Sequence, residues 1–115
     1  IFRYDPQVYG VSRAVFLKAL AAEGIPAAPG YAIPLHRQVL FTERHFGPYT
    51  GCLDTHPQLD YRQVSLPVCE RASDTAGAWL YQSLLLGSRR DMDDIAAAFE
   101  KLYTHRSELA SVAAD

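Results

Sequence analysis

Apolar and polar residues alternate with helical spacing in two parts of the chain. The first part runs from Arg13 to about Glu23, and the second runs from Arg89 to about His105. In both, apolar residues recur three or four positions apart, which is typical of a helix that buries one face. The apolar positions are Val15, Phe16, Ala19 and Leu20 in the first helix, and Met92, Ile95, Ala96, Phe99, Leu102 and Tyr103 in the second.

Capping residues mark the ends of these two helices. Ser12 and Ser88 each precede a first turn, where a serine hydroxyl accepts a hydrogen bond from a free backbone N–H. Asp91 completes a capping pair with Ser88 and suits the positive end of the helix dipole. Gly24 suits the left-handed conformation that ends the first helix, with Ile25 folding back onto that helix.

Short extended segments are expected outside the helices. Residues 1–5 alternate as a strand does, Pro6 ends this strand, and residues 9–12 are expected to form a turn. Prolines at three of the positions between residues 26 and 34 exclude a helix and allow at most a short strand. Residues 78–82 are expected to form a short apolar strand.

Proline also opens two helical pieces. Pro67 begins a helix that ends near Gly77, and Pro34 begins a brief helical turn, because proline is tolerated at a first helical position. Residues 45–60 carry Gly, Pro, Thr and Asp at close intervals without a sustained period, which predicts one long loop. Loops of this length are usually functional or partly disordered, and both interpretations stay open.

Composition and charge narrow the class of protein. The chain has 115 residues, enough for a single domain with one core, and its formal net charge is −2. Basic residues are interspersed with acidic ones, so no charge pattern indicates binding to nucleic acid or to an anionic membrane. No apolar run approaches the roughly 20 residues of a membrane-spanning helix, and no signal peptide opens the chain. We therefore expect a soluble, cytoplasmic domain over residues 1–115.

The charged stretch at residues 89–94 allows two interpretations. In the first, Ser88 caps a helix while Arg89 and Arg90 neutralise acidic residues four positions later on a solvated surface. In the second, the free N–H groups and the two arginines bind an anion such as phosphate. The first interpretation is favoured, and the second stays open.

Candidate metal ligands and nucleophiles are few. His45, Cys52 and His56 share one loop, but their spacing matches no compact zinc finger and no fourth ligand is evident. No metal site is therefore predicted. Cys69 has no histidine base beside it on its helix, so we expect a buried structural thiol, with both cysteines reduced.

The lysines and the polar residues of the proline-rich segment are further candidates for site residues. Lys18 and Lys101 lie on the polar sides of predicted helices, where a solvated ammonium is a poor nucleophile. No catalytic residue is assigned. Tyr31, His36 and Arg37 are candidates for substrate binding, because a proline-stiffened backbone positions polar side chains at little entropic cost. The competing interpretation is that they are ordinary loop residues.

Four motifs in combination resemble one enzyme family. They are LAAEGIP at residues 20–26, YAIPLH at 31–36, PVCERA at 67–72, and WL followed by LLLGSRRDMDDI at 79–95. The chain resembles, from Ile1 to about Tyr103, the carboxy-terminal region of the DegT/DnrJ/EryC1/StrS family of aminotransferases. These enzymes depend on pyridoxal 5'-phosphate and belong to fold type I.

The resemblance implies a fold and an activity. It implies an α/β or, more strictly, α+β domain, with a short, mainly antiparallel sheet and helices packed on one side. Family members are homodimers that transfer an amino group from glutamate or glutamine to a keto sugar or keto cyclitol. Their cofactor lysine belongs to a large domain, so no cofactor-binding residue is assigned here, and this chain alone is expected to be inactive. The ending at residues 84–95 looks more like the branch that acts on cyclitols.

The resemblance also bears on the site residues. The segment that matches residues 30–36 approaches the active site in the family, which makes Tyr31 and His36 the matched positions for substrate contact. Gly30 departs from the family, because many members have His there. Because the chain opens within a strand, we expect it to be a carboxy-terminal piece of a longer protein. The rival hypothesis is a free-standing binding domain, and an exposed apolar patch would argue against it.

Overall fold

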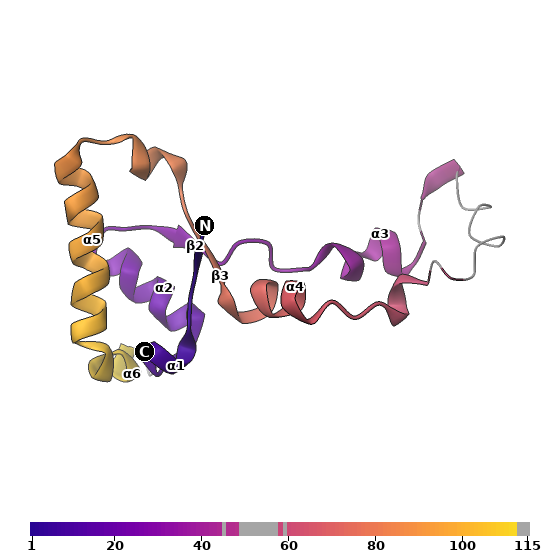
Figure 1. Cartoon of the computed structure of the whole chain (residues 1–115), viewed down its shortest axis with the longest axis horizontal. Helices are drawn as coiled ribbons and strands as arrows, with labels where there is room; N and C mark the ends of the chain where they lie inside the picture. The colour runs from indigo at the N-terminus through magenta and orange to yellow at the C-terminus, as the bar shows by residue number, and fades with distance from the viewer. Residues whose placement is uncertain (45, 49–57, 59, 113–115) are drawn as a thin grey trace.

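The chain forms a helical body from which a thin arm projects (Figure 1). This computed structural model describes residues 1–44, 46–48, 58 and 60–112. We define the arm as residues 30–44 and 60–71, which leave the body and return to it side by side. The radius of gyration is 19.0 Å, whereas a compact chain of this length has a radius of gyration of about 13 Å. The arm is therefore not folded back onto the body.

The body contains a small antiparallel sheet of three short strands. Its strands are β1 (Phe2–Arg3), β2 (Ala27–Ala28) and β3 (Gly77–Leu80). β3 lies between the other two, with Phe2 opposite Ala78 and Ala27 opposite Leu80. The three predicted extended segments each contribute a strand. The expected α+β class with a short antiparallel sheet is therefore confirmed.

The core lies where two long helices pack beside this sheet. They are α2 (Arg13–Ala22) and α5 (Arg89–Thr104). Phe16 and Leu20 of α2 are completely buried, and the Phe16 ring centroid lies 4.9 Å from that of Tyr4 and 5.9 Å from that of Phe99. Burying a side chain of this size contributes about 1.5–3 kcal/mol. These contacts fix the body, from which the arm then emerges.

Both helices begin and end at the predicted caps. The Ser12 hydroxyl accepts a hydrogen bond from a first-turn N–H of α2. Gly24 ends that helix with φ of 86°, and the Ile25 N–H donates to a last-turn carbonyl at 3.1 Å. At α5, the Asp91 carboxylate accepts from the Ser88 N–H at 2.6 Å, while the Ser88 hydroxyl accepts from the Asp91 N–H at 3.4 Å. The capping predictions are confirmed.

The predicted buried faces were partly wrong. In α5, Ala98 and Leu102 are buried, whereas Ala96 and Tyr103 are exposed. In α2, Leu17 is buried although the prediction omitted it. The helices are covered along narrow stripes, so residues on the flanks of each apolar face remain in solvent. Spacing alone does not indicate which flank is covered.

A short helix before the turn expected at residues 9–12 was missed. It is α1 (Pro6–Tyr9). The Asp5 carboxylate accepts from the Gln7 N–H at 2.9 Å, and Pro6 occupies the first helical position. Gly10 then ends the helix with φ of 72°. An acidic cap and a proline together therefore favour one helical turn here.

The carboxy-terminal tail continues as helix. Residues Arg106–Glu108 form a 3-10 turn, and α6 follows at Leu109–Val112. Leu109 is buried and joins the core. None of the helices in the described ranges is both long and apolar enough to span a membrane.

The arm is built from short helical pieces. They are a 3-10 turn (Leu35–Arg37), α3 (Val39–Thr42), a 3-10 turn (Tyr61–Gln63) and α4 (Pro67–Arg71), which runs on as a π-helical turn (Ala72–Ala76). Both helical pieces predicted after proline are confirmed. The predicted loop at residues 45–60 lies largely outside the described residues.

Candidate functional site

Glu70, on α4 of the arm, holds two of the predicted site residues. Its Oε1 lies 3.1 Å from His36 Nε2 and accepts a hydrogen bond from the Leu66 N–H at 2.8 Å. Its Oε2 lies 2.7 Å from the Arg37 guanidinium. The Leu66 N–H, followed by His36 and Arg37, holds the pKa of Glu70 below its ordinary value. Glu70 is therefore an anion that orders its neighbours.

Local sequence explains why these groups meet. Pro34 begins the 3-10 turn that carries His36 and Arg37, and Pro67 begins the helix that carries Glu70. A carboxylate in a first helical turn is stabilised by the free N–H groups there. The two turns lie in the outgoing and the returning segment of the arm. They place the Glu70 carboxylate beside the His36 imidazole and the Arg37 guanidinium.

His36 is buried, with 5% of its side chain exposed. Because Nε2 faces the Glu70 carboxylate, we assign the proton to Nε2 in the neutral ring, which makes Nδ1 an acceptor. Nδ1 is buried and has no hydrogen-bond partner among residues 1–44, 46–48, 58 and 60–112. The ring is thus fixed at one nitrogen only.

Arg37 is half exposed and bridges two carboxylates. Besides Glu70, its guanidinium contacts Asp74 Oδ2 at 3.3 Å. Asp74 belongs to the π-helical turn that follows α4. We call His36, Arg37, Glu70 and Asp74 the Glu70 cluster. Its arginine is the member with N–H groups that a ligand can reach.

Tyr31 lies apart from the Glu70 cluster. Its ring is exposed and packs edge-on against Trp79, with centroids 4.7 Å apart. Its backbone carbonyl accepts a hydrogen bond from Ser73, the neighbour of Asp74. The structure therefore brings His36 and Arg37 together. Tyr31 is linked only through its backbone carbonyl, to the π-helical turn that carries Asp74.

Gly30 has a structural reason to be glycine. Its φ is 76°, and a Cβ at this position would lie 2.8 Å from Trp79 Nε1. Both the left-handed backbone and the indole exclude a larger side chain. The glycine at this position is therefore explained by the packing of Trp79.

The sequence-based reasoning missed Arg13 and the role of Glu70. Arg13 donates hydrogen bonds to the carbonyls of Ser73, Asp74 and Gly77 at 2.9, 3.1 and 2.8 Å. These hydrogen bonds attach the turn after α4 to α2, and we call them the clamp. A single arginine in a first helical turn gives no distinctive signal, whereas Glu70 stood within the PVCERA motif.

The structure tests the prediction for Cys69 but does not describe the candidate metal ligands of the loop. The prediction that Cys69 is buried was wrong, because α4 lies on the arm and Cys69 is exposed there. His45, Cys52 and His56 lie outside the described residues. Within the described part of the chain, no three His, Cys, Asp or Glu side chains are grouped as metal ligands.

The charged stretch before α5 is a capping structure. The Asp91 carboxylate occupies the position beside the Ser88 N–H that a bound anion would take. The Ser88 hydroxyl and N–H lower the pKa of Asp91. Arg89 and Asp93 are both exposed and 3.9 Å apart, so their pairing contributes little. The capping interpretation is therefore confirmed over the anion site.

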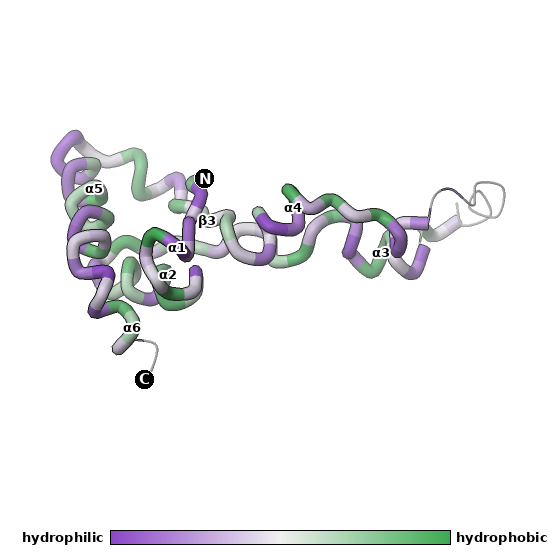
Figure 2. The backbone as a smooth tube through the Cα atoms, turned by 60° about the horizontal axis from the view of Figure 1, so that its bottom comes forward, coloured by the Kyte–Doolittle hydropathy of each residue, from purple (hydrophilic) through white to green (hydrophobic). Residues whose placement is uncertain are grey.

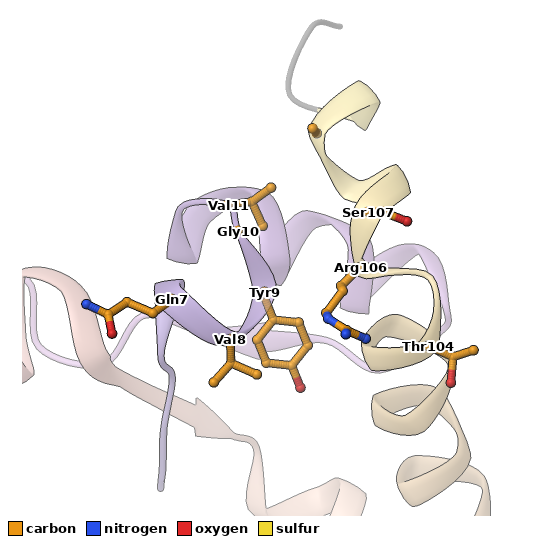
Figure 3. A pocket seen from close by; sticks show the side chains of 9 residues that line it. Gln7, Val8, Tyr9, Gly10, Val11, Thr104, Arg106 and Ser107 are labelled. Atoms are coloured by element: carbon orange, nitrogen blue, oxygen red, sulfur yellow. The ribbon is translucent and has the colours of Figure 1, made fainter.

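Two of the open pockets on the body include charged residues in their lining. One, of about 480 Å³, lies between α1 and the start of α6 and includes Tyr9 and Arg106 (Figure 3). The other, of about 770 Å³, lies at the base of the arm and is lined by residues that include Arg13, Lys18 and Asp74. The second pocket shares Asp74 with the Glu70 cluster, so this cluster borders a largely apolar cavity.

Comparison with known proteins finds similar segments in aminotransferases. The chain is 42% identical to an L-glutamine:2-deoxy-scyllo-inosose aminotransferase of Streptomyces fradiae over 97 residues, which are 81% of this chain and 22% of that protein. It is 38% identical to the enzyme of the same name from Streptomyces paromomycinus over 96 residues, 83% of this chain and 22% of that protein. For the enzyme of that name from Streptoalloteichus tenebrarius, the identity is 34% over 106 residues, 91% of this chain and 24% of that protein.

The coverage of these relatives is short. The chain spans less than a quarter of the length of each of the three. No sequence model of a protein family matches the chain, and no solved structure matches it. Most of this chain is therefore similar to one segment of much longer aminotransferases that are named for L-glutamine and a keto cyclitol.

Proposed function

We propose that this chain is one segment of an aminotransferase that moves an amino group from L-glutamine to a keto cyclitol. The identity to enzymes so named, which extends over at least 81% of this chain in three of them, carries the proposal. The Glu70 cluster supports it from the structure, because it presents ordered hydrogen-bond donors beside a cavity. A cyclitol, which is rich in hydroxyl and carbonyl oxygens, is a ligand for such donors.

The cofactor of the proposed reaction is pyridoxal 5'-phosphate, and the lysines of this chain do not fit the role of binding it. Lys101 Nζ is paired with Glu23 Oε2 at 2.7 Å, and Lys18 is exposed on the surface of α2. These are the two lysines in the sequence. The cofactor, which supplies an electron sink for amino transfer when bound, would therefore be held by polypeptide outside this chain.

The proposed role of this chain is to form a wall of the substrate pocket. The exposed guanidinium N–H groups of Arg37 donate to oxygens of the substrate, and Glu70 keeps both Arg37 and His36 in place. The exposed Tyr31 side chain, whose backbone carbonyl accepts a hydrogen bond from Ser73, adds a second contact. A wall of this kind also excludes water from the reacting groups.

An exposed apolar surface supports this proposal over a free-standing binding domain. Leu35 and Val68, both on the arm, are 69% and 70% exposed. A free-standing soluble domain rarely leaves large apolar patches uncovered. The same surface is expected of a segment that packs against further polypeptide.

The proposal is tested with a hybrid enzyme. In this hybrid, the present chain replaces the matching segment of the S. fradiae aminotransferase, and transfer of the amino group from L-glutamine to 2-deoxy-scyllo-inosose is measured. We expect the hybrid to keep activity within about tenfold of the parent, a difference of about 1.4 kcal/mol in barrier height. The 115-residue chain alone is expected to show none. A folded hybrid without amino transfer would refute the proposal.

A further inference from the structure

The cavity between α1 and the turn before α6 takes no part in the proposed function. Its volume is about 480 Å³, within the range of about 300–1,000 Å³ that is typical of small-molecule sites. It shares no lining residue with the cavity at the base of the arm. Figure 2 shows α6 at the edge of the body, with the arm extending away from it. We call this space the Arg106 cavity, and its lining includes Val8, Tyr9, Val11, Thr104, Arg106 and Ser107.

The charge that faces this cavity is positive. Among the described residues that line it, Arg106 is the charged one. The nearby Glu108 carboxylate lies 3.1 Å from His105 and does not line the cavity. Burial and the neighbouring Tyr103 raise the pKa of Tyr9, so this phenol stays neutral and adds no negative charge. The Arg106 guanidinium therefore favours an anion in this space.

Arg106 is oriented by two contacts with Tyr103. Its Nη1 donates to the Tyr103 carbonyl at 2.8 Å, and its Cζ lies 4.5 Å from the centroid of the Tyr103 ring. Its Nε–H and Nη2–H groups have no acceptor among residues 1–44, 46–48, 58 and 60–112. These two groups form a planar fork that matches the two oxygens of a carboxylate. Figure 3 shows Arg106 and Tyr9 pointing toward one another from the two sides of the cavity.

The remaining walls fit a small organic acid better than a phosphate ester. Val8 and Val11 contribute apolar surface, and Thr104 and Ser107 carry hydroxyl groups. A carboxylate has a single negative charge, which the guanidinium balances, whereas a phosphate ester carries a charge of about −1.5 to −2 at neutral pH. The excess charge of a phosphate ester is costly to place beside apolar walls.

We infer that the Arg106 cavity binds the carboxylate of a small organic acid. The inference does not rest on the proposed function, because the cavity shares no residue with the Glu70 cluster. In the bound state, the Nε–H and Nη2–H groups of Arg106 donate to the two carboxylate oxygens. The apolar part of the acid lies against Val8 and Val11.

Titration of the isotope-labelled chain with sodium butyrate tests the inference, because butyrate joins a carboxylate to a short apolar chain. Two-dimensional NMR spectra follow the Nε–H group of Arg106 and the backbone N–H groups of Val11 and Ser107. At an ionic strength held constant with sodium chloride, we expect these signals to shift until the site is saturated. Butyramide, the uncharged analogue, should bind at least about tenfold more weakly, because it cannot form the charge-assisted pair. Equal shifts with both compounds, or shifts with neither, would overturn the inference.

Inorganic phosphate distinguishes the two classes of anion. Because the cavity supplies one positive charge, we expect phosphate to shift the same signals less than butyrate does at equal concentration and ionic strength. Tighter binding of phosphate than of butyrate would overturn the assignment to a carboxylate.

Two substitutions test the location of the site. Arg106→Gln removes the charge from the cavity, and Arg90→Gln removes the charge of another exposed arginine, on α5, which does not line the cavity. Arg106→Gln should weaken butyrate binding at least about tenfold, while Arg90→Gln leaves it unchanged within about twofold. Equal losses in the two variants would contradict a site at Arg106. Since butyrate and butyramide are compared first in the unsubstituted chain, the inference can fail even if Arg106→Gln does not fold.

Discussion

At the scale of single residues, the Glu70 carboxylate decides how His36 and Arg37 are presented. It accepts from the Leu66 N–H and faces both side chains, and these contacts lower its pKa. A carboxyl whose pKa is lower in the folded than in the unfolded state stabilises the fold above its unfolded pKa. That stabilisation is lost as the pH falls through its folded pKa.

The Glu70 carboxylate predicts a pH dependence of stability. We expect the free energy of unfolding of the chain to fall as the pH drops below 4.5, the ordinary pKa of this group. Glu70→Gln should remove part of this dependence, because a neutral amide does not titrate. Urea unfolding between about pH 3 and pH 7 measures both effects. Glu100→Gln, an exposed change on α5, is the control, and an unchanged pH profile in Glu70→Gln would contradict the role of Glu70.

Gly30 predicts a large effect of a single methyl group. Gly30→Ala places a Cβ against Trp79 in a left-handed backbone, whereas Gly24→Ala meets nothing within 4 Å at a similar φ. The backbone term alone is about 1–2 kcal/mol at either position. We expect Gly30→Ala to lose more free energy of unfolding than Gly24→Ala and to shift the fluorescence of Trp79. Equal losses would mean that the indole does not restrict this position.

At the scale of elements, the clamp between α2 and the turn after α4 joins the body to the arm. Arg13 makes three hydrogen bonds to carbonyls of Ser73, Asp74 and Gly77. This turn also carries the contacts to Arg37 and to the Tyr31 backbone. The geometry of the Glu70 cluster therefore depends on a residue of a distant helix.

Removal of the clamp should destabilise the chain. A hydrogen bond from a charged group contributes about 1.5–3 kcal/mol, so Arg13→Ala should lower the free energy of unfolding by about that amount or more. Lys18→Ala, an exposed change on the same helix, serves as the reference and should have almost no effect. Chemical denaturation of the two variants measures the difference. Similar midpoints would show that the clamp contributes nothing.

Sequence predicted the elements whose signals are local. Ser12, Gly24 and Ser88 act within one turn of their own helices, so their capping roles were predicted correctly. The buried positions of α5 were predicted less well, because packing against α2 decides that Ala98 rather than Ala96 is covered. Burial depends on neighbours that spacing does not show.

In the candidate site, too, local signals were predicted from the sequence, whereas contacts between distant residues were not. The prolines predicted the turns that carry His36 and Glu70. That His36 contacts the substrate stays a prediction. The pairing of His36 with Glu70 joins residues 34 positions apart, and no pattern along the chain indicates it. Cys69 was predicted to be buried because the exposure of the arm is a property of the whole fold.

At the scale of the whole molecule, the arm gives the chain its dimensions. The principal extents are 56, 32 and 23 Å. Small-angle X-ray scattering of the isolated chain should therefore give a radius of gyration near 19.0 Å. A value near 13 Å, that of a compact chain of this length, would mean that the arm folds onto the body in solution.

The central claim is that this chain serves as a segment of an aminotransferase. Amino transfer from L-glutamine to 2-deoxy-scyllo-inosose by the S. fradiae hybrid tests this claim most directly. We predict product formation by the hybrid, with none from the isolated chain or from the parent enzyme lacking the segment. A hybrid that folds but forms no product would contradict the claim.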